Sequence, residues 1–320
     1  MEWFKVILGL ILLIWSADKL VEYAAKLAFR LNVSPLVIGL TIIGFGTSAP
    51  EIFVAIISSL KNNEGIALGN ALGSNIANIG LVIGMTAILQ PIVKSTQTVR
   101  DELIALLIIS FSIFALLLFF DFTLWVGIVL ILTLTVFLLW LIKTSKEHHD
   151  PSDISGLDKN HSSLAKMLTG LFISLLILGA GSNLLVSGAA QIALSLGVRE
   201  TFIGLTVVAV GTSLPELSVS IIGIIKKQHG IALGNIIGSN VFNLTAVLAP
   251  IAFISPGTKI SLLVKYQDFP VMLLLTALFS LPFLVPSRKK FAINRVSGIF
   301  LLAIYICYLT LLIHQAKTMI

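Results

Sequence analysis

Long apolar stretches alternate with short polar connections along nearly the whole chain. Ten stretches approach or exceed the roughly 20 residues that a helix needs to cross the hydrocarbon core of a bilayer. They cover residues 4–29, 35–60, 66–91, 102–120, 123–143, 165–196, 201–225, 231–254, 269–286 and 293–314. This pattern predicts an all-α polytopic membrane protein with ten transmembrane helices.

The composition agrees with that prediction and narrows the function. Of the 320 residues, 57% are apolar and only 11% are charged, which is far from the composition of a soluble globular protein. The net charge of +6 comes from Lys and Arg residues scattered over short loops. We therefore expect a lipid bilayer around the chain, no nucleic-acid partner and no obligate protein partner.

The basic residues favour one orientation, because inside loops carry an excess of Lys and Arg. With the N-terminus outside, the outside positions hold only Lys5, Lys61, Arg199, Lys259, Lys265 and Lys317. The inside positions then hold Arg30, Lys94, Arg100, Lys143, Lys146, Lys159, Lys166, Lys226, Lys227, Arg288, Lys289, Lys290 and Arg295. We expect both termini outside, in the plasma (cell inner) membrane.

One segment of the chain occurs twice. The stretch "VSPLVIGLTIIGFGTSAPEIFVAIISSLKNNEGIALGNALGSNIANIG" from Val33 matches "VRETFIGLTVVAVGTSLPELSVSIIGIIKKQHGIALGNIIGSNVFNLT" from Val198, at a constant offset of 165. Five spans precede the second copy, and because five is odd, the copies cross the membrane in opposite directions. Such inverted repeats are typical of secondary transporters, whose sites lie where the repeats meet. We expect repeats at 1–144 and 164–320, joined by a polar inside linker at 145–163.

Each copy places a carboxylate within an apolar span. Glu51 and its repeat mate Glu216 each follow a proline, and a charged group at this depth is retained mainly where it serves an ion or a partner. Pro50 removes a helical donor, so we predict a helix broken around Gly46 and Thr47. Thr47 and Glu51 are four residues apart and share a helix face. Thr212, Ser213, Glu216 and the Gly211 carbonyl supply the matching half of this oxygen-rich site.

A second polar layer follows in each copy. Ser74 and Asn78, like Ser239 and Asn243, are four residues apart and aim at one spot. Gly69 with Gly73, and Gly234 with Gly238, form small-residue faces that let helices approach closely. We expect these faces to bring Asn78 and Asn243 against the Glu-bearing helices, whereas interhelical hydrogen bonding is the expected role of the remaining amides, Asn70, Asn75, Asn235 and Asn240.

Asp18 and Glu22 have a different expected role, because Lys19 and Lys26 lie near them. Glu22 and Lys26 have the spacing of a helical ion pair, so we expect the inner end of helix 1 to emerge here into lipid headgroups. The repeat places Asn183 opposite Asp18. This carboxylate is therefore not symmetric.

The two GTSxPE and two GNxxGSNxxN blocks resemble the repeats of the cation/calcium antiporter superfamily, specifically its sodium/calcium exchanger branch. The resemblance implies ten transmembrane helices, with helices 2, 3, 7 and 8 enclosing the ions and helices 1 and 6 sliding past them to alternate access. It also implies transport of Ca²⁺ and Na⁺, at about three Na⁺ per Ca²⁺. The ligands that it implies are Glu51, Thr47, Ser48, Ser74, Asn78, Glu216, Thr212, Ser213, Ser239 and Asn243, with the backbone carbonyls of Gly44 and Ala209.

Asn at both 78 and 243 departs from family members that carry Asp at one of these positions, so we do not expect potassium co-transport. We expect no enzyme activity and no cofactor. Proton/calcium exchange stays an alternative, because two Glu residues also carry protons, and sodium dependence of calcium flux discriminates the two. A passive cation channel would conduct without counter-ion coupling, and a membrane scaffold would not bind calcium.

Overall fold

The computed structural model describes residues 1–93, 99–144, 163–197, 209–285 and 291–318, so the linker expected at 145–163 lies outside the described residues except for Ser163. The first copy contains helices α1 (Glu2–Leu31), α2 (Pro35–Ile38), α3 (Gly44–Leu60), α4 (Glu64–Ala77), α5 (Gly84–Leu89), α6 (Arg100–Phe119) and α7 (Leu124–Thr144). The second contains α8 (Leu164–Ser195), α10 (Ala209–Thr212), α11 (Leu214–Ile225), α12 (His229–Phe242), α13 (Ala249–Ile254), α14 (Phe269–Leu284) and α15 (Arg295–Thr318).

Several helices are joined end to end by π-helical turns. These turns are η1 (Gly39–Ile43), η2 (Asn78–Ile83), η5 (Asn243–Val247) and η6 (Val264–Asp268). As a result, α2, η1 and α3 form one continuous helical span, and so do α4, η2 and α5, and α12, η5 and α13. A π-turn widens the helix locally and is found frequently at functional sites. Both Asn78 and Asn243 are the first residues of such turns.

The predicted break at Gly46 and Thr47 is wrong for the first copy. The α-helix α3 runs through both residues and contains Pro50, and the irregular turn is η1, immediately before it. Gly39 and Gly44 flank η1, and both pack against the backbone of α12, so this close helix contact, and not the proline, coincides with the irregularity. In the second copy, Ser213 separates α10 from α11, two residues before Pro215.

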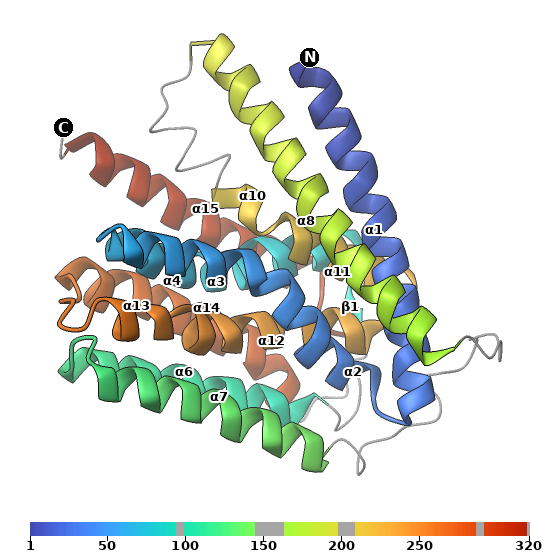
Figure 1. The fold of residues 1–320 in the computed structure, drawn as a ribbon, viewed down its shortest axis with the longest axis horizontal. Helices are drawn as coiled ribbons and strands as arrows, with labels where there is room; N and C mark the ends of the chain where they lie inside the picture. Colours follow the sequence, from blue (N-terminus) through green and yellow to red (C-terminus); the bar gives the residue numbers. More distant parts are fainter. Residues whose placement is uncertain (94–98, 145–162, 198–208, 286–290, 319–320) are drawn as a thin grey trace.

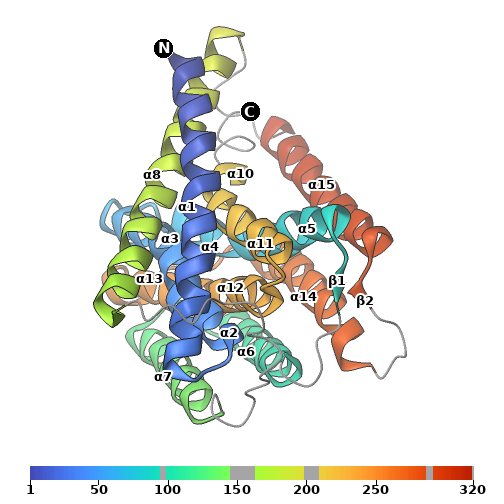
Figure 2. The ribbon, with the colours of Figure 1, turned by 90° about the vertical axis from the view of Figure 1, so that its right-hand side faces the viewer.

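The helices form two groups. In Figure 1, α1 and α8 rise steeply side by side, while α3, α4, α6, α7 and α12–α15 lie together in a bundle that crosses below them. Figure 2, turned by 90°, shows α1 and α8 again beside one another. Three glycines let them approach: a methyl group added at Gly9 would lie 2.7 Å from the Gly181 carbonyl oxygen, and one at Gly188 would lie 2.9 Å from that of Glu2.

Close contacts in the bundle fix the directions of its helices. A methyl group added at Gly39 would lie 3.0 Å from Gly234, and one at Gly44 would lie 3.1 Å from Gly238, so α12 runs parallel to the span that contains α3. A tight turn at Lys226–Gln228 makes α11 antiparallel to α12. Corresponding helices α3 and α11 therefore run in opposite directions. We call the bundle end at the α3–α4 turn the Lys61 face and the end at the α11–α12 turn the Lys226 face.

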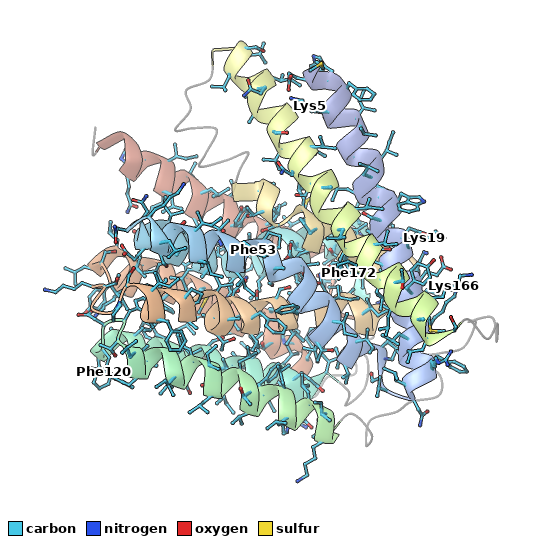
Figure 3. All side chains as sticks on the ribbon, viewed as in Figure 1. Lys5, Lys19, Phe53, Phe120, Lys166 and Phe172 are labelled. Atoms are coloured by element: carbon cyan, nitrogen blue, oxygen red, sulfur yellow. The ribbon has the colours of Figure 1, made fainter. Side chains whose placement is uncertain are left out.

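Eight helical spans in the described part of the chain are long and apolar enough to cross a membrane. Two expected spans are not among them: α1 carries Asp18, Lys19, Glu22 and Lys26 within its length, and the apolar helix Leu214–Ile225 is too short by itself. Large apolar side chains point outward from the ribbon along the bundle, including Phe53 on α3 and Phe172 on α8 (Figure 3). In water this surface would be costly, whereas in lipid it is the ordinary exterior of a membrane protein.

The connections hold the bundle together at both ends. At the Lys61 face, Ser255 Oγ donates to the Ser59 carbonyl oxygen at 3.2 Å, and the backbone N–H of Phe122 donates to the Thr258 carbonyl oxygen at 3.1 Å. At the other end, strand β1 (Ile92–Val93) pairs antiparallel with β2 (Phe291–Ile293). This short pairing is an exception to the predicted all-α structure.

Candidate cation-binding site

Two buried carboxylates lie where the two copies meet. Glu51 on α3 and Glu216 on α11 are each only 1% exposed to solvent. Ser74 on α4 interacts with the Glu51 carboxylate, and Thr47 on α3 interacts with the Glu216 carboxylate. No Lys or Arg pairs with either carboxylate among the described residues. Neither carboxylate therefore has a basic partner in the described protein.

In three pairs of repeat mates, the same buried oxygen lacks a hydrogen-bond partner on both members in the described structure. They are Ser48 and Ser213 through Oγ, Glu51 and Glu216 through Oε2, and Asn78 and Asn243 through Oδ1. Leaving such an oxygen unpaired in an apolar interior costs about 1–3 kcal/mol, and more for a charged group. Oxygens without a protein partner on both members of a pair are the atoms that a cation bound between the repeats would use as ligands.

The turns that begin at the two asparagines pack against the carboxylate-bearing helices of the opposite copy. The turn η2, which begins at Asn78, contacts α11, which carries Glu216. The turn η5, which begins at Asn243, contacts α3, which carries Glu51. Asn78 uses its Nδ2 atom to donate to Asn240 Oδ1 at 3.1 Å, so its Oδ1 atom is the one left for a ligand. Each carboxylate-bearing helix thus contacts a turn of the other repeat that begins with an asparagine.

Some of the predicted oxygen ligands already bond one another. Thr47 Oγ1 lies 3.1 Å from Ser239 Oγ and donates to Asn235 Oδ1 at 3.0 Å. The Ser239 hydroxyl lies 3.4 Å from the Gly44 carbonyl oxygen, within donating distance. All three predicted residues, Thr47, Ser239 and Gly44, are therefore brought together, on the side of the site that α3 shares with α12. A cation bound there has to compete with these hydrogen bonds or use the remaining lone pairs of the same oxygens.

The second copy supplies its predicted residues in a different arrangement. Ser213 is buried at the step between α10 and α11, and Thr212, at the end of α10, is half-buried. The Gly211 carbonyl oxygen, a predicted contributor, accepts a hydrogen bond from Ser182 Oγ on α8 at 2.9 Å. Ala209, whose carbonyl was implied as a ligand, is the first residue of α10. This half of the site is therefore coupled directly to α8.

The glycine faces of the two copies are not equivalent. Gly234 and Gly238 are buried on α12, and a methyl group added at either would meet the backbone of Leu36 or Leu40. Their mates on α4 differ: Gly69 is exposed and Gly73 is half-buried, and an added methyl would meet no described atom within 4 Å. The expected close approach therefore occurs for α12 and not for α4. Gly234 lies towards the Lys226 face and Gly69 towards the Lys61 face.

The remaining amides play the structural role that was predicted for them, with one exception. Asn75 Nδ2 donates to the Asn240 carbonyl oxygen at 3.2 Å, and Asn235 Nδ2 lies 3.4 Å from the Glu216 carbonyl oxygen. Asn235 therefore links Thr47 of the first copy to the Glu216 helix of the second, a role that its spacing from other motifs did not indicate. Asn70, the mate of Asn235, has no partner for its Nδ2 atom in the described structure.

The chemistry of this site suits a hard cation. Carboxylate, hydroxyl, amide and backbone oxygens are the ligands of Ca²⁺ and other hard ions, whereas Zn²⁺ and Cu²⁺ favour imidazole or thiolate. Among the described residues, no three His, Cys, Asp or Glu side chains lie close enough together to hold a metal ion by themselves. A site with only two carboxylates among many neutral oxygens favours reversible binding of an ion over its permanent retention.

Comparisons with known proteins agree with one another. The sodium/calcium exchanger protein family matches residues 1–143 and 166–314, which covers both repeats. The sodium/calcium exchanger MaX1 of Methanosarcina acetivorans is 29% identical over 97% of both chains, and the inner membrane protein YrbG of Escherichia coli is 35% identical over 86% of both. The solved structure of the sodium/calcium exchanger from Methanococcus jannaschii superposes with a TM-score of 0.82 at 32% identity, covering 97% of each chain.

Proposed function

Because the chain belongs to the sodium/calcium exchanger family, we propose that it is an antiporter that moves Ca²⁺ across a membrane in exchange for Na⁺. The observation that carries this proposal is the mirrored set of unpartnered oxygens on Ser48, Glu51, Asn78, Ser213, Glu216 and Asn243. Both Ca²⁺ and Na⁺ accept such ligands. The full proposed ligand set adds Thr47, Ser74, Thr212, Ser239 and the carbonyls of Gly44 and Ala209.

Ca²⁺ fits the site better than Mg²⁺ does. It takes six to eight oxygens in a flexible geometry, whereas Mg²⁺ requires a near-octahedral shell and gives up its water reluctantly. Ligands here come from the two repeats, which meet at an interface that must move during transport. A cation that tolerates an irregular, changing shell is the one such a site can both bind and release.

Charge neutralisation gives a physical reason for the exchange of Ca²⁺ against Na⁺. If Glu51 and Glu216 are ionised, they place about −2 on the site, with no basic partner among the described residues. One Ca²⁺ neutralises this charge, and Na⁺ ions replace it by occupying parts of the same oxygen set. We propose about three Na⁺ per Ca²⁺, because the mirrored ligands provide room for more than two small monovalent ions.

We propose ten transmembrane helices in two inverted repeats. The eight apolar spans would be joined by α1, whose charges at Asp18, Lys19, Glu22 and Lys26 lie towards its inner half, and by the span that contains α11. Opposite directions of α3 and α11 support the inversion. With both termini outside, in the cell inner membrane, the Lys61 face would be outside and the Lys226 face inside.

The same geometry supports alternating access. Contacts of Gly234 and Gly238 seal α12 against α2 and η1 towards the Lys226 face, while Gly69 is exposed towards the Lys61 face. This arrangement fits a site that is open towards the Lys61 face. We propose that α1 and α8 move as a pair against the bundle, because they pack mainly on one another (Figure 1), and that the mirror-image arrangement gives access from the Lys226 face.

The deciding experiment uses the purified full chain in liposomes loaded with Na⁺ and diluted into Na⁺-free buffer with calcium-45. Exchange predicts uptake that depends on the outward Na⁺ gradient and stops when external Na⁺ equals internal Na⁺. A proton/calcium exchanger would take up calcium on imposing a pH gradient without Na⁺. A channel would pass calcium down its own gradient without either counter-ion, and either of these results would overturn sodium/calcium exchange.

A further inference from the structure

One ion pair joins the mobile pair α1 and α8 to the bundle. Lys226 Nζ, at the end of α11, lies 2.7 Å from Asp18 Oδ1 in the middle of α1. The same Nζ also donates to the Asp18 carbonyl oxygen at 3.1 Å. Three other ion pairs, Lys5–Glu2, Lys19–Glu22 and Lys26–Glu22, lie within α1 itself. The Asp18–Lys226 pair therefore fastens α1 to the Lys226 face.

The nearest carboxylate on α1 is already paired and does not compete with Asp18 for Lys226. Glu22, the nearest acidic residue along α1, is bonded to Lys19 at 2.8 Å and to Lys26 at 2.6 Å. Next to Asp18, the side chains of Ala17, Leu20 and Val21 are fully buried, and α1 packs against α11 and α2 there. The ion pair thus closes the edge of an apolar contact.

The second repeat lacks this contact. The mates of Asp18 and Lys226 are Asn183 on α8 and Lys61 at the end of α3. Both are exposed, and no hydrogen bond joins them in the described structure. In the mirror-image conformation, α8 would meet the Lys61 face as α1 meets the Lys226 face here. Lys61 would then face a neutral amide where Lys226 faces a carboxylate.

We propose that the Asp18–Lys226 ion pair is a one-sided latch, which stabilises the conformation closed at the Lys226 face and has no counterpart in the conformation closed at the Lys61 face. This inference rests on the alternating access proposed above. Inverted repeats alone would give the two conformations similar free energies. The ion pair lowers the free energy of the conformation closed at the Lys226 face relative to the other. An ion pair with about one-third of each side chain exposed, 32% for Lys226 and 39% for Asp18, changes an equilibrium by roughly two- to fivefold.

The latch is tested by measuring conformational populations without requiring transport. Spin labels are placed at Asn62 and Gln191, exposed positions on the α3–α4 turn and on α8, in the full-length chain with Cys307→Ser. Pulsed electron resonance in lipid nanodiscs then gives the ratio of the two distance populations. Asp18→Asn should raise the population closed at the Lys61 face by about two- to fivefold, and Asn183→Asp should raise it similarly by giving Lys61 a carboxylate partner.

Two further variants separate the latch from general damage. The charge swap Asp18→Lys with Lys226→Asp should restore the original ratio, which a purely structural effect would not do. Lys5→Gln removes an ion pair of similar exposure that lies within α1 alone, Lys5–Glu2 at 2.9 Å, and should leave the ratio unchanged.

An unchanged ratio in both Asp18→Asn and Asn183→Asp would overturn the latch, as would an equal shift in Lys5→Gln. A single distance population in every variant would overturn it too, together with alternating access. Sodium-driven calcium uptake, measured in parallel, reports separately on the exchange itself. A shifted ratio in a chain that transports a different counter-ion would leave the latch standing.

Discussion

Asn75 and Asn240 occupy the same position in the two repeats, and the side-chain amide of the first donates to the backbone carbonyl oxygen of the second at 3.2 Å. The reciprocal bond is missing, because Asn240 Nδ2 has no partner in the described structure. Asn240 Oδ1 instead accepts from Asn78. The two repeats therefore meet here as near-mirror images in different states, and variants at paired positions should behave unequally wherever the structure is asymmetric.

The carboxylates are the exception, because each supplies charge to one shared site. Glu51→Gln and Glu216→Gln should each abolish calcium uptake while the protein still inserts into the membrane. Removing one charge from a buried electrostatic site costs about 3–5 kcal/mol, which corresponds to more than about 100-fold weaker binding. Calcium-45 uptake into proteoliposomes measures the loss. Glu64→Gln, at the first turn of α4, is the matched control, and near-normal uptake by either site variant would remove that residue from the site.

Asn243 and Asn75 should separate function from stability. Neither polar side-chain atom of Asn243 has a hydrogen-bond partner in the described structure, so Asn243→Ala should weaken transport without lowering thermal stability in the absence of ions. Asn75 donates a hydrogen bond that is worth about 1 kcal/mol, so Asn75→Ala should lower thermal stability. Thermal unfolding of the detergent-purified variants, beside uptake, checks both. Equal destabilisation by the two substitutions would contradict the assignment.

The paired glycines should respond oppositely to an added methyl group. Gly234→Ala would press against the backbone of Leu36, and overpacking of this kind costs about 1–3 kcal/mol, so thermal stability should fall. Gly69→Ala meets no described atom within 4 Å and should leave stability unchanged. Its uptake should nevertheless fall, if α4 forms the mirror-image contact during turnover. Normal uptake by Gly69→Ala would argue against that contact.

Exchange should be electrogenic. Three Na⁺ in place of one Ca²⁺ leave about +1 on the sodium-loaded site, and one charge is worth about 2.3 kcal/mol per 100 mV. In proteoliposomes with a fixed sodium gradient, a potential set with potassium and valinomycin should shift the calcium reversal point by an amount equal to one net charge. A reversal point that ignores the potential would leave exchange intact and exclude the stoichiometry.

Asn62, in the turn of the Lys61 face, should be outside. The single cysteine, Cys307, is exposed, so the test uses Asn62→Cys in a Cys307→Ser background. An impermeant maleimide should label intact cells. Labelling only after permeabilisation would reverse the orientation inferred from the Lys and Arg distribution, and a cysteine at Lys227, at the opposite face, gives the complementary result.

The parts of the structure that follow from local pattern could be predicted from the sequence. The Glu22–Lys26 ion pair forms at its helical spacing, at 2.6 Å, and the η2 and η5 turns that begin at Asn78 and Asn243 contact the opposing Glu-bearing helices. These outcomes depend on helix periodicity and on the repeat, both of which are visible in one chain.

Features that depend on packing between distant segments could not be predicted. Pro50 alone indicated a break at Gly46, but the irregular turn lies at η1, where Gly39 and Gly44 meet α12. Asp18 was expected among headgroups, and the structure pairs it with Lys226, a residue 208 positions away. Asn235 is hydrogen-bonded, whereas Asn70 Nδ2 has no partner in the described structure. Because the two repeats have the same sequence around these positions, this difference arises from the conformation of the protein.

The hydrogen bond from Thr47 to Asn235 can form only late in the synthesis of the chain. Its two residues are 188 positions apart, and at about 5–20 residues per second a ribosome needs roughly 10–40 s to cover that distance. Throughout that interval the nascent first repeat contains Glu51 but lacks α12, the helix that later packs against it. A translocon or an insertase has to shelter this half-built surface from lipid until α12 arrives. Chains that terminate between the repeats should therefore be cleared by membrane proteases instead of accumulating.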